Sequence, residues 1–398
     1  MLKGKHIILG ICGGIAAYKS ATLLRLLVKA GAEVQVVITP AGKEFITPVT
    51  LSALSGKPVV SEFFSANTGE WHSHVDLGLW ADAMVIAPAT ASSIAKMAHG
   101  VADNMLITTY LSAKAPVFVA PAMDLDMMAH PSTVANLELL RSYGCHIIEP
   151  AEGELASHLV GKGRMEEPEK IFDVLDDFFT PKDLAGRRVL ITAGPTRERI
   201  DPVRYISNYS SGKMGYAIAL EAARRGADVT LVSGPVSIGI DHPRVRVVSV
   251  ESAREMLDAS MAAWPESDVA VMCAAVADYA PASAADSKIK REHQDVPVLH
   301  LVKNPDIAAT LGQCKRPGQI LVGFALETDH EIDNAAEKIR RKGLDAIVLN
   351  SLRDAGAGFG VDTNKVTIIA ADGTSTPYPL KPKAAVAADI IDYITTKN

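Results

Sequence analysis

The six residues 210–215 (SSGKMG) combine hydroxyl groups, glycines and a lysine at the expected start of a helix. An apolar run at residues 189–191 and a small-residue turn at residues 192–195 precede them. The first amides of a helix have no intrahelical partner and the helix dipole is positive there, so such a start suits anionic groups. The pattern therefore indicates nucleotide or phosphate binding, although glycine turns of this kind also occur wherever a strand turns sharply into a helix.

A pair of histidines forms a second group that could do chemistry. His72 and His74 stand two apart, and Asp76 follows them. Imidazole and carboxylate groups are zinc ligands, but no further ligand signal accompanies these three residues, so we disfavour a metal here. A single histidine is more often structural, and the spacing alone leaves the role of His74 open.

The elements that must carry these residues repeat one plan. Residues 5–9 predict a strand, residues 10–14 a glycine loop before a helix that Gly31 ends, and residues 33–38 a second strand. The same order recurs from residue 189 to residue 232. We therefore expect an α/β fold with two successive Rossmann-like, parallel-sheet domains, at residues 1–183 and 184–398.

Two polar turns, at residues 88–93 and 121–124, each follow a predicted strand. Ligands of parallel sheets bind beyond the carboxyl ends of the strands, so we expect both turns on one rim with the glycine loop at residues 10–14. The glycine-rich stretch at residues 153–165 suits a mobile flap or a surface loop.

Composition excludes several classes of protein. The 398 residues carry a net charge of -6 and give a pI near 6.0, which argues against nucleic-acid binding. The apolar stretches are too short to span a membrane, and the first residues lack the apolar core of a signal peptide. The four cysteines show no CxxC spacing and are expected to be reduced thiols, so we expect a cytoplasmic protein.

Taken together, the motifs resemble the bacterial bifunctional proteins of coenzyme A biosynthesis, in which a phosphopantothenoylcysteine decarboxylase is joined to a phosphopantothenate–cysteine ligase. In the first half the matching strings are GGIAAYK (13–19), PATASSIAKMAHGVADN (88–104), PAMDLDM (121–127) and GKGRM (161–165). In the second half they are GPTRERIDPVRYISNYSSGKMG (194–215), CAAVADY (273–279), KIKR (288–291), KNPDI (303–307), GFALET (323–328) and FGVDTNKV (359–366).

The resemblance implies that the first domain binds FMN and decarboxylates 4'-phosphopantothenoylcysteine. A carboxylate next to an amide-bearing carbon has no electron sink, and oxidation of the cysteine thiol by FMN would create one. The implied FMN contacts are Gly13, Gly14, Thr39, Ser92 and Ser93. The implied catalytic residues are His74, Asp124 and Ser157, with Arg164 as a substrate contact.

Two of these residues depart from the family pattern. The family usually has asparagine where Asp124 stands and a cysteine acid where Ser157 aligns. A carboxylate at residue 124 would repel the substrate carboxylate unless it is protonated, and serine is a far weaker acid than a thiol. His158 or Cys12 is the alternative proton donor.

For the second domain the resemblance implies ligation of 4'-phosphopantothenate to L-cysteine, with CTP activating the carboxylate as an acyl-cytidylate. Lys288 matches the lysine that neutralises charge on the phosphates, Asn208 matches the residue that handles the acyl-cytidylate, and Asp278 would contact the ribose or Mg²⁺. Lys338 and Lys342 lie four apart on one helix face and reach the same phosphates, or form a solvated basic face. The remaining implied substrate contacts are Cys273, Ala274, Asn304, Pro305, Asp306, Ile307 and Phe324, the last of which fits the core equally well.

Two alternatives of other classes stay open. The chain could be a ligase whose FMN-binding domain has lost decarboxylation, which the residues at positions 124 and 157 would decide, or a non-enzymatic flavin-binding scaffold, which Lys288, Asn208 and Asp278 count against. The resemblance also implies a homo-oligomer, with trimers of the flavin domain and dimers of the ligase domain combining into a dodecamer.

Overall fold

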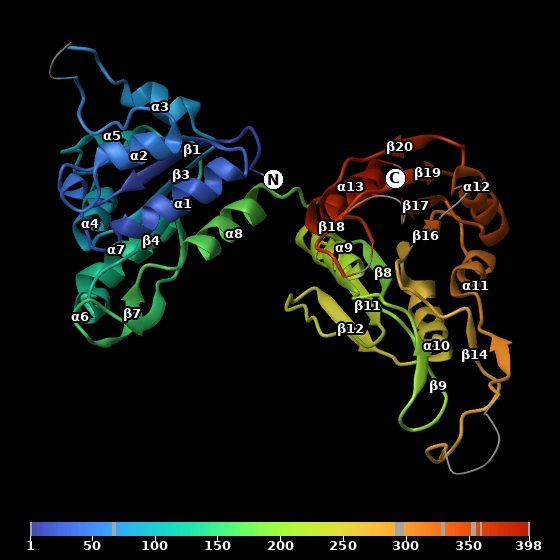
Figure 1. Cartoon of the computed structure of the whole chain (residues 1–398). Coiled ribbons are helices and arrows are strands. Elements are labelled where there is room, and N and C mark those ends of the chain that lie inside the picture. Colours follow the sequence, from blue (N-terminus) through green and yellow to red (C-terminus); the bar gives the residue numbers. More distant parts are fainter. Residues whose placement is uncertain are drawn as a thin grey trace. The chain divides into compact units, whose positions relative to one another are not determined.

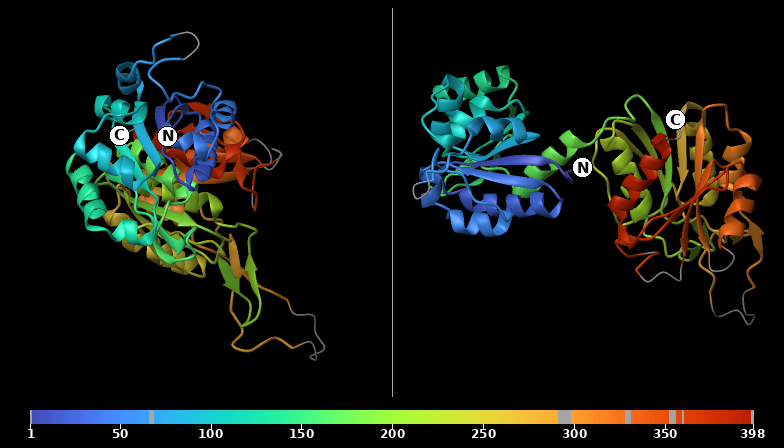
Figure 2. Two further views of the ribbon diagram at one scale, coloured as in Figure 1. Left: turned by 90° about the vertical axis from the view of Figure 1, so that its left-hand side faces the viewer. Right: turned by 90° about the horizontal axis from the view of Figure 1, so that it is seen from above.

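The computed structural model describes residues 2–65, 69–290, 298–327, 331–351, 356–358 and 360–396. The chain divides into two compact units, Met1–Thr180 and Pro181–Asn398. Each unit is a sheet with helices on both faces (Figures 1 and 2), which confirms the predicted α/β class. Arg291, Thr328 and Phe359, which belong to three of the matching strings, lie outside the described residues.

The first unit is built on a five-stranded parallel sheet of order β2-β1-β3-β4-β5. Its strands are β1 (His6–Ile11), β2 (Glu33–Ile38), β3 (Ala83–Ala89), β4 (Val117–Pro121) and β5 (His146–Ile147). The central strands β3 and β4 are continuous, fully buried apolar runs, as expected where both faces of a parallel sheet are covered. Residues such as Leu9 and Val85 pack under α1 and α8, whereas Ile8 and Met84 pack under α4, α5 and α7.

Five helices of the first unit, α2, α3, α4, α5 and α7, begin at a residue whose side chain caps the helix. Thr90 accepts the amide of Ser93 at the start of α4, and Gly100 ends that helix in the left-handed conformation. The helices are α1 (Ala17–Lys29), α2 (Pro48–Ser55), α3 (His74–Trp80), α4 (Ala91–His99), α5 (Met105–Ser112), α6 (Leu125–Ala129), α7 (Pro131–Ser142) and α8 (Pro168–Phe179), with a 3-10 turn η1 (Ala41–Glu44).

The glycine-rich stretch expected to be a flap or a loop belongs to an antiparallel hairpin, whose register shifts once, between Ala151 and Glu152. Its strands are β6 (Ala151–Glu154) and β7 (Val160–Arg164). The sequence hides this hairpin because its glycines and charged residues break the alternation of apolar and polar side chains that marks a strand.

The second unit contains an eight-stranded sheet of order β12-β11-β8-β13-β16-β17-β19-β20. Its strands are β8 (Arg188–Ala193), β11 (Asp228–Ser233), β12 (Val245–Ser249), β13 (Val269–Met272), β16 (Ile320–Glu327), β17 (Ala346–Ser351), β19 (Thr367–Ala370) and β20 (Ser375–Pro377). The first six strands in this order are parallel, and β19 and β20 join antiparallel. A tight turn with Gly373 in the left-handed region connects β19 to β20, and so short a connection permits only antiparallel pairing.

Two groups of helices cover this sheet. α9 and α13 pack on one face through residues such as Ile218 and Ile390, and α10, α11 and α12 pack on the other through Met256, Leu311 and Ile339. The helices are α9 (Lys213–Arg224), α10 (Ala253–Ala263), α11 (Ile307–Gln313), α12 (Glu331–Lys342) and α13 (Lys383–Thr396), with a 3-10 turn η2 (Trp264–Glu266). A further two-stranded pair consists of β18 (Thr363–Asn364) and β21 (Lys381–Pro382).

A projecting arm extends from the second unit (Figure 2). It consists of the hairpin β9 (Arg197–Arg199) and β10 (Tyr205–Ser207) together with β14 (Tyr279–Pro281) and β15 (Leu301–Lys303). The backbone amide of Ala285 donates to the carbonyl of Ile200 at 2.9 Å, which ties the two hairpins together. Within the described residues no helix is long and apolar enough to cross a membrane.

Candidate functional site

The residues predicted to hold FMN follow the carboxyl ends of neighbouring parallel strands. In the register of the sheet Ile11 pairs with Ile38, and Ala89 pairs with Pro121. The glycine loop after β1, Thr39 after β2 and the turn before α4 therefore lie along one rim. This rim is where parallel sheets bind ligands.

Close packing explains the glycine at position 13. A Cβ atom there would lie 2.7 Å from the Cβ of Ala41, and one at Gly14 would meet only Thr90 at 3.4 Å. Ser93 is buried beside the Thr90 hydroxyl at 3.3 Å, whereas Ser92 is exposed. A backbone cradle followed by a helix start with hydroxyl groups fits the phosphate of a flavin nucleotide.

Asp124 and Ser157 meet although 33 positions separate them. The Ser157 hydroxyl donates to Asp124 Oδ2 at 2.5 Å. The β6–β7 hairpin brings them together because it packs tightly on the loop after β4: a Cβ at Gly163 would lie 2.5 Å from the carbonyl oxygen of Met123. The serine is thus engaged with the carboxylate at position 124.

The two alternative proton donors differ in access. Cys12 is fully buried, and burial raises the pKa of its thiol. His158 is exposed, adopts a φ of 65° and lies 3.2 Å from Glu154 Oε1 through its Nδ1. A donor to a bound substrate must be accessible, so the geometry favours His158 over Cys12.

Arg164 ends the hairpin in an ion pair. Its Nη2 donates to Glu167 Oε1 at 3.0 Å, and the buried Lys19 donates to the same oxygen at 3.0 Å and to the Met165 carbonyl at 2.8 Å. Lys19 belongs to α1, directly after the glycine loop, so the base of the hairpin is tied to the element that begins at the predicted flavin site.

His74 lies on α3 and is held differently. Ser73 caps this helix, and the His74 ring makes an edge contact with Phe63 at 6.3 Å between centroids. Its Nδ1 atom is buried without a hydrogen-bond partner among the described residues, so one hydrogen-bonding position of the ring is left unsatisfied. His72 instead lies 3.0 Å from the Ser65 hydroxyl, and the part of the chain that the structure describes holds no group of three metal-ligating side chains.

The second unit carries two adjoining cavities of about 490 and 320 Å³ at the carboxyl ends of β8, β13, β16 and β17. Ala274, Asp278, Phe324 and Lys338 line both cavities. The larger cavity is also lined by Asn304, Pro305, Asp306, Ile307 and Lys342, and the smaller one by Cys273 and residues 210–215. The structure therefore gathers the predicted nucleotide contacts with the predicted anion-binding helix start.

Thr192, in β8, and Thr196, in the turn after β8, position the loop that follows β13. Thr192 Oγ1 accepts the amide of Ala274 at 3.2 Å, and Thr196 Oγ1 accepts the amide of Ala277 at 3.0 Å. The Ala277 carbonyl in turn accepts the side-chain amide of Asn304 at 2.8 Å. These bonds hold the chain that follows Met272, where β13 ends.

Charges at the cavities are partly compensated. Lys342 pairs with Asp306 at 3.0 Å, and Lys213 pairs with Asp362 at 2.6 Å. Burial raises the pKa of Cys273 to about 12, so this thiol is a neutral lining group near pH 7. Phe324 lies half-buried in the wall of both cavities and also packs against the core, which reconciles its two predicted roles.

Asn208 and Lys288 line neither cavity. The Asn208 side-chain amide donates to the Ala275 carbonyl at 2.7 Å, so it lies beside the loop after β13. Lys288 is exposed on the projecting arm.

Lys213, Asn350 and Lys383 also line the smaller cavity; the sequence analysis covered Lys213 within the SSGKMG string but did not single out the other two. Lys213 lies inside the SSGKMG string, and Asn350 ends a predicted strand, so both carried a usable signal. Asn350 Oδ1 is buried without a partner in the described part of the chain. Lys383 is buried at the start of α13. Its burial lowers its pKa, and the positive charge of the nearby Lys213 lowers the pKa further. Nothing in the local sequence indicates that Lys383 lines a cavity.

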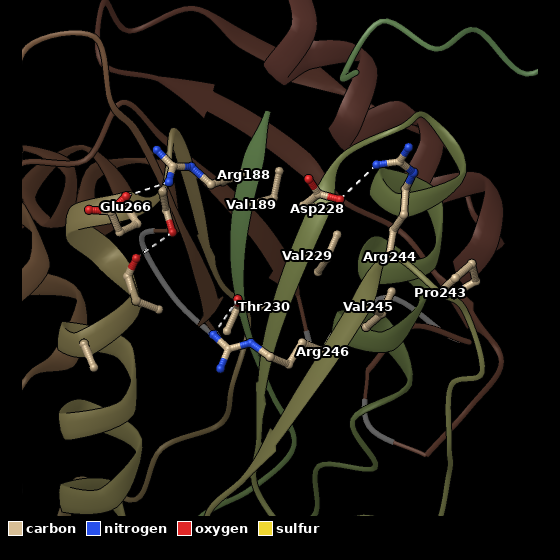
Figure 3. A pocket seen from close by; sticks show the side chains of 13 residues that line it. Arg188, Val189, Asp228, Val229, Thr230, Pro243, Arg244, Val245, Arg246 and Glu266 are labelled. Atoms are coloured by element: carbon tan, nitrogen blue, oxygen red, sulfur yellow. Dashed lines mark hydrogen bonds and ion pairs between the residues drawn. The ribbon is translucent and has the colours of Figure 1, made fainter. Parts of the chain in front are cut away.

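Another hollow, of about 380 Å³, lies at the opposite, amino-terminal ends of β8, β11 and β12 (Figure 3). Its three arginines all have partners: Arg188 pairs with Glu266 at 2.6 Å, Arg244 pairs with Asp228 at 2.9 Å, and Arg246 donates to Thr230 at 3.2 Å. Parallel sheets bind ligands at the carboxyl ends of their strands, whereas this hollow lies at the amino-terminal ends. Because its arginines are also already paired, we do not regard it as a candidate ligand site.

Comparisons with known proteins follow the same division of the chain. Residues 1–180 match the family model "Flavoprotein", and residues 184–397 match "DNA/pantothenate metabolism flavoprotein C-terminal domain". The chain is 46% identical over 394 residues to the "Coenzyme A biosynthesis bifunctional protein CoaBC" of Haemophilus influenzae, covering 99% of this chain and 98% of that protein.

Two more relatives are similar over most of their length. The Bacillus subtilis protein of the same name is 44% identical over 397 residues, covering 99% of this chain and 97% of that protein. A "Cysteine/Cysteine sulfinic acid decarboxylase" of an unknown prokaryotic organism is 56% identical over 356 residues, covering 88% of this chain and 99% of that protein.

Proposed function

The chain belongs to the family of coenzyme A biosynthesis bifunctional proteins, and we propose that residues 1–183 form its decarboxylase domain and residues 184–398 its ligase domain. Membership confirms the predicted enzyme, a carboxy-lyase joined to an acid–amino-acid ligase, and the flavoprotein family of the first half supports the predicted FMN. Each of the two activities would then have its own domain and its own set of residues.

The ligase domain joins 4'-phosphopantothenate to L-cysteine. The phosphopantothenate carboxylate attacks the α-phosphorus of CTP, pyrophosphate leaves, and the cysteine amine then displaces CMP from the acyl-cytidylate. The observation that carries this assignment is the pair of adjoining cavities that share Ala274, Asp278, Phe324 and Lys338. One cavity accommodates the nucleoside and the other, with the α9 start, an anionic group.

Charge compensation is the main task of the residues around the triphosphate. Lys288 and Lys338 neutralise the phosphates, and Lys342 contributes when it exchanges Asp306 for a phosphate. Among the described residues Asp278 is the one carboxylate that lines both cavities, so we assign it to Mg²⁺, whose other ligands would be phosphate oxygens and water. Asn208, fixed by Ala275, orients the acyl group.

Pyrophosphate release tests the ligase assignment. Lys288→Ala should lower kcat/KM for CTP by roughly 10²- to 10³-fold, the usual effect of removing a group that stabilises developing charge. Lys290→Ala, which removes the next exposed lysine of the same segment, should change kcat/KM little. Equal effects of the two substitutions would contradict the assignment, and removal of Mg²⁺ by a chelator should abolish release.

In the decarboxylase domain, FMN would be held by the loop with Gly13 and Gly14, by Thr39, and by Ser92 and Ser93 at the start of α4. When bound, it supplies the two-electron oxidation of the cysteinyl thiol that makes decarboxylation possible, and it returns those electrons afterwards. His74 transfers a proton through its imidazole ring, and Arg164 holds the substrate phosphate. Ser157 and Asp124 close the hairpin over the site through their hydrogen bond.

Carbon dioxide release from 4'-phosphopantothenoylcysteine tests this assignment in the FMN-loaded protein. Release should be measurable in the unmodified chain and faster in Ser157→Cys, because a thiol is a better proton donor than a hydroxyl. No release from either protein, with FMN bound, would contradict a decarboxylase role on this substrate and leave the ligase alone.

A second candidate activity of the first domain is decarboxylation of free L-cysteine. Asp124 favours it, because a carboxylate can pair with the ammonium group of a free amino acid, which an acylated cysteine lacks. The relative named for cysteine and cysteine sulfinic acid is consistent with it. A sulfinate has no thiol to oxidise, so we restrict this candidate to cysteine.

Comparison of kcat/KM for the two substrates in an Asp124 variant tests whether the first domain decarboxylates free L-cysteine. Asp124→Asn should lower kcat/KM for L-cysteine at least tenfold and raise that for 4'-phosphopantothenoylcysteine, because the substitution removes the pairing charge and restores the usual residue. Loss on both substrates would instead give Asp124 a catalytic role common to both.

We further propose that the protein works in the cytoplasm, where its free cysteines stay reduced, and that it assembles through its exposed apolar surfaces. In the first unit these lie at Trp71 and Leu79, and on the arm of the second unit at Val203 and Leu301. A trimeric flavin domain and a dimeric ligase domain would give a dodecamer. Light scattering that shows a monomer would contradict the assembly.

A further inference from the structure

Asp201 belongs to the string GPTRERIDPVRYISN, yet the proposed function gives it no task. It lies in the turn between β9 and β10, and its side chain is 0% exposed. Its Oδ1 accepts the backbone amides of Val203 at 2.8 Å and Arg204 at 2.9 Å. Its Oδ2 accepts Nε and Nη2 of Arg204, at 3.0 and 2.5 Å. The carboxylate therefore organises its own turn and fixes the Arg204 guanidinium.

The same carboxylate also holds a distant segment of the chain. Asp201 Oδ2 accepts the backbone amide of Ile289 at 3.1 Å, 88 positions away. The Ile289 carbonyl accepts Arg204 Nη2 at 2.9 Å. The amide and the carbonyl of Ile289 are thus both hydrogen-bonded to the Asp201–Arg204 pair, which fixes the position and the rotation of the backbone at this residue.

Lys288 is the neighbour of Ile289, and its side chain extends from this clamped backbone into solvent. A lysine on a free loop loses conformational entropy when it meets a phosphate, whereas one on a fixed backbone loses less. The hydrogen bonds from Arg204 and from three backbone amides hold the pKa of Asp201 far below its usual range, so the carboxylate is ionised near neutral pH.

We propose that Asp201 is a positioning residue of the ligase: through Arg204 and Ile289 it holds the backbone that presents Lys288 to the CTP phosphates. This inference rests on the role proposed for Lys288. It explains why an ionised, solvent-inaccessible carboxylate lies in an arm that has little core of its own, where a buried charge persists only if it is fully hydrogen-bonded.

Calorimetric titration of CTP, with Mg²⁺ and without 4'-phosphopantothenate, measures the effect on binding in the absence of turnover. Asp201→Asn keeps the shape of the side chain but cannot accept all five hydrogen bonds. We expect Lys288→Ala and Asp201→Asn each to weaken CTP binding by roughly ten- to hundredfold, the order of effect that follows when a positioned group is misplaced. The double variant should bind CTP no more weakly than Lys288→Ala, since Asp201 acts only through that lysine.

A matched control uses the other buried carboxylate of this hairpin. Glu198 is 5% exposed and accepts the amide of Ala253 at the start of α10, away from residues 288–290. Glu198→Gln should leave the CTP affinity within about twofold of that of the unmodified chain, because substitutions at sites that share no partners have nearly independent effects. FMN content and carbon dioxide release from the same chains check that the first unit is intact.

The outcomes distinguish failure of the role proposed for Lys288 from failure of the positioning role proposed for Asp201. Unchanged CTP affinity and pyrophosphate release in Lys288→Ala would contradict the proposed role of Lys288 itself. A strong effect of Lys288→Ala with none from Asp201→Asn, or additive losses in the double variant, would overturn only the positioning role. If thermal unfolding shows that Asp201→Asn disrupts the ligase unit, Arg204→Lys, which leaves the carboxylate in place but cannot bridge to Ile289, replaces it in the same cycle.

Discussion

Side chains at both candidate sites have partners within the chain that a substrate must replace or share. Ser157 donates to Asp124, Lys342 pairs with Asp306, and Asn208 donates to Ala275. Each contact holds a side chain in one place before binding, and each must be exchanged if that side chain is to contact the substrate directly. The measured affinity for a substrate therefore contains the free energy of breaking these contacts.

The pair of Lys342 and Asp306 makes this exchange measurable. Asp306→Asn should tighten CTP binding about two- to fivefold, because it releases Lys342 from a partly exposed ion pair and removes a negative charge from the cavity. Asparagine is also a good N-cap, so the start of α11 should survive. Calorimetry measures the affinity, and weaker binding would instead mean that the Asp306 carboxylate contacts the nucleotide.

At the scale of elements, the strand-to-helix units were predictable and the segments between them were not. Apolar runs bounded by glycine predicted β1, β2, β8 and β11 within about two residues. The hairpin of β6 and β7 was missed because its pairing depends on its packing against Leu125 and Met123 rather than on an apolar pattern. The glycines of β7 contact residues nearly 40 positions earlier in the chain, and such long-range contacts cannot be predicted from a local sequence pattern.

Close approach of η1 to the glycine loop supports a test of the flavin site. Gly13→Ala would place a methyl group 2.7 Å from the Cβ of Ala41, so the loop or η1 must move. We expect unit 1 to lose roughly 1–3 kcal/mol of unfolding free energy, as in other overpacked sites, and to bind less FMN. Gly239→Ala, which meets nothing within 4 Å, is the control. Flavin absorbance and thermal unfolding measure both effects, and unchanged FMN content would contradict the placement of the phosphate here.

At the scale of the whole molecule, each unit has its own buried core on both faces of its own sheet. Separate cores of this size are what independently folding domains require. The two proposed activities therefore have separate scaffolds, and each can serve as an internal control for substitutions in the other.

Fragments test this independence. Residues 1–180 should fold alone and bind FMN, and residues 181–398 should fold alone and bind CTP. CTP at 100 times its dissociation constant should stabilise the second fragment by about 2.7 kcal/mol and leave the first unchanged. Scanning calorimetry of each fragment measures this, and a fragment that remains unfolded would show that its unit needs the rest of the chain.

The sequence by itself determined the α/β class, the two successive domains and the family. These depend on apolar periodicity, on glycine at tight turns and on strings of residues that lie close together in the chain. It also singled out several of the residues that line the two adjoining cavities of the second unit, since the carboxyl ends of parallel strands meet at one edge.

Only the tertiary structure decided which of these residues meet and what holds them. Ser157 donates to Asp124, 33 positions away, Lys383 Nζ donates to the carbonyl of Gly358, 25 positions away, and Asp201 accepts the amide of Ile289, 88 positions away. Such contacts depend on how separate elements pack, and neither residue type nor spacing records that packing. The chemistry was therefore readable from the chain, whereas the positioning of the groups that perform it was a property of the fold.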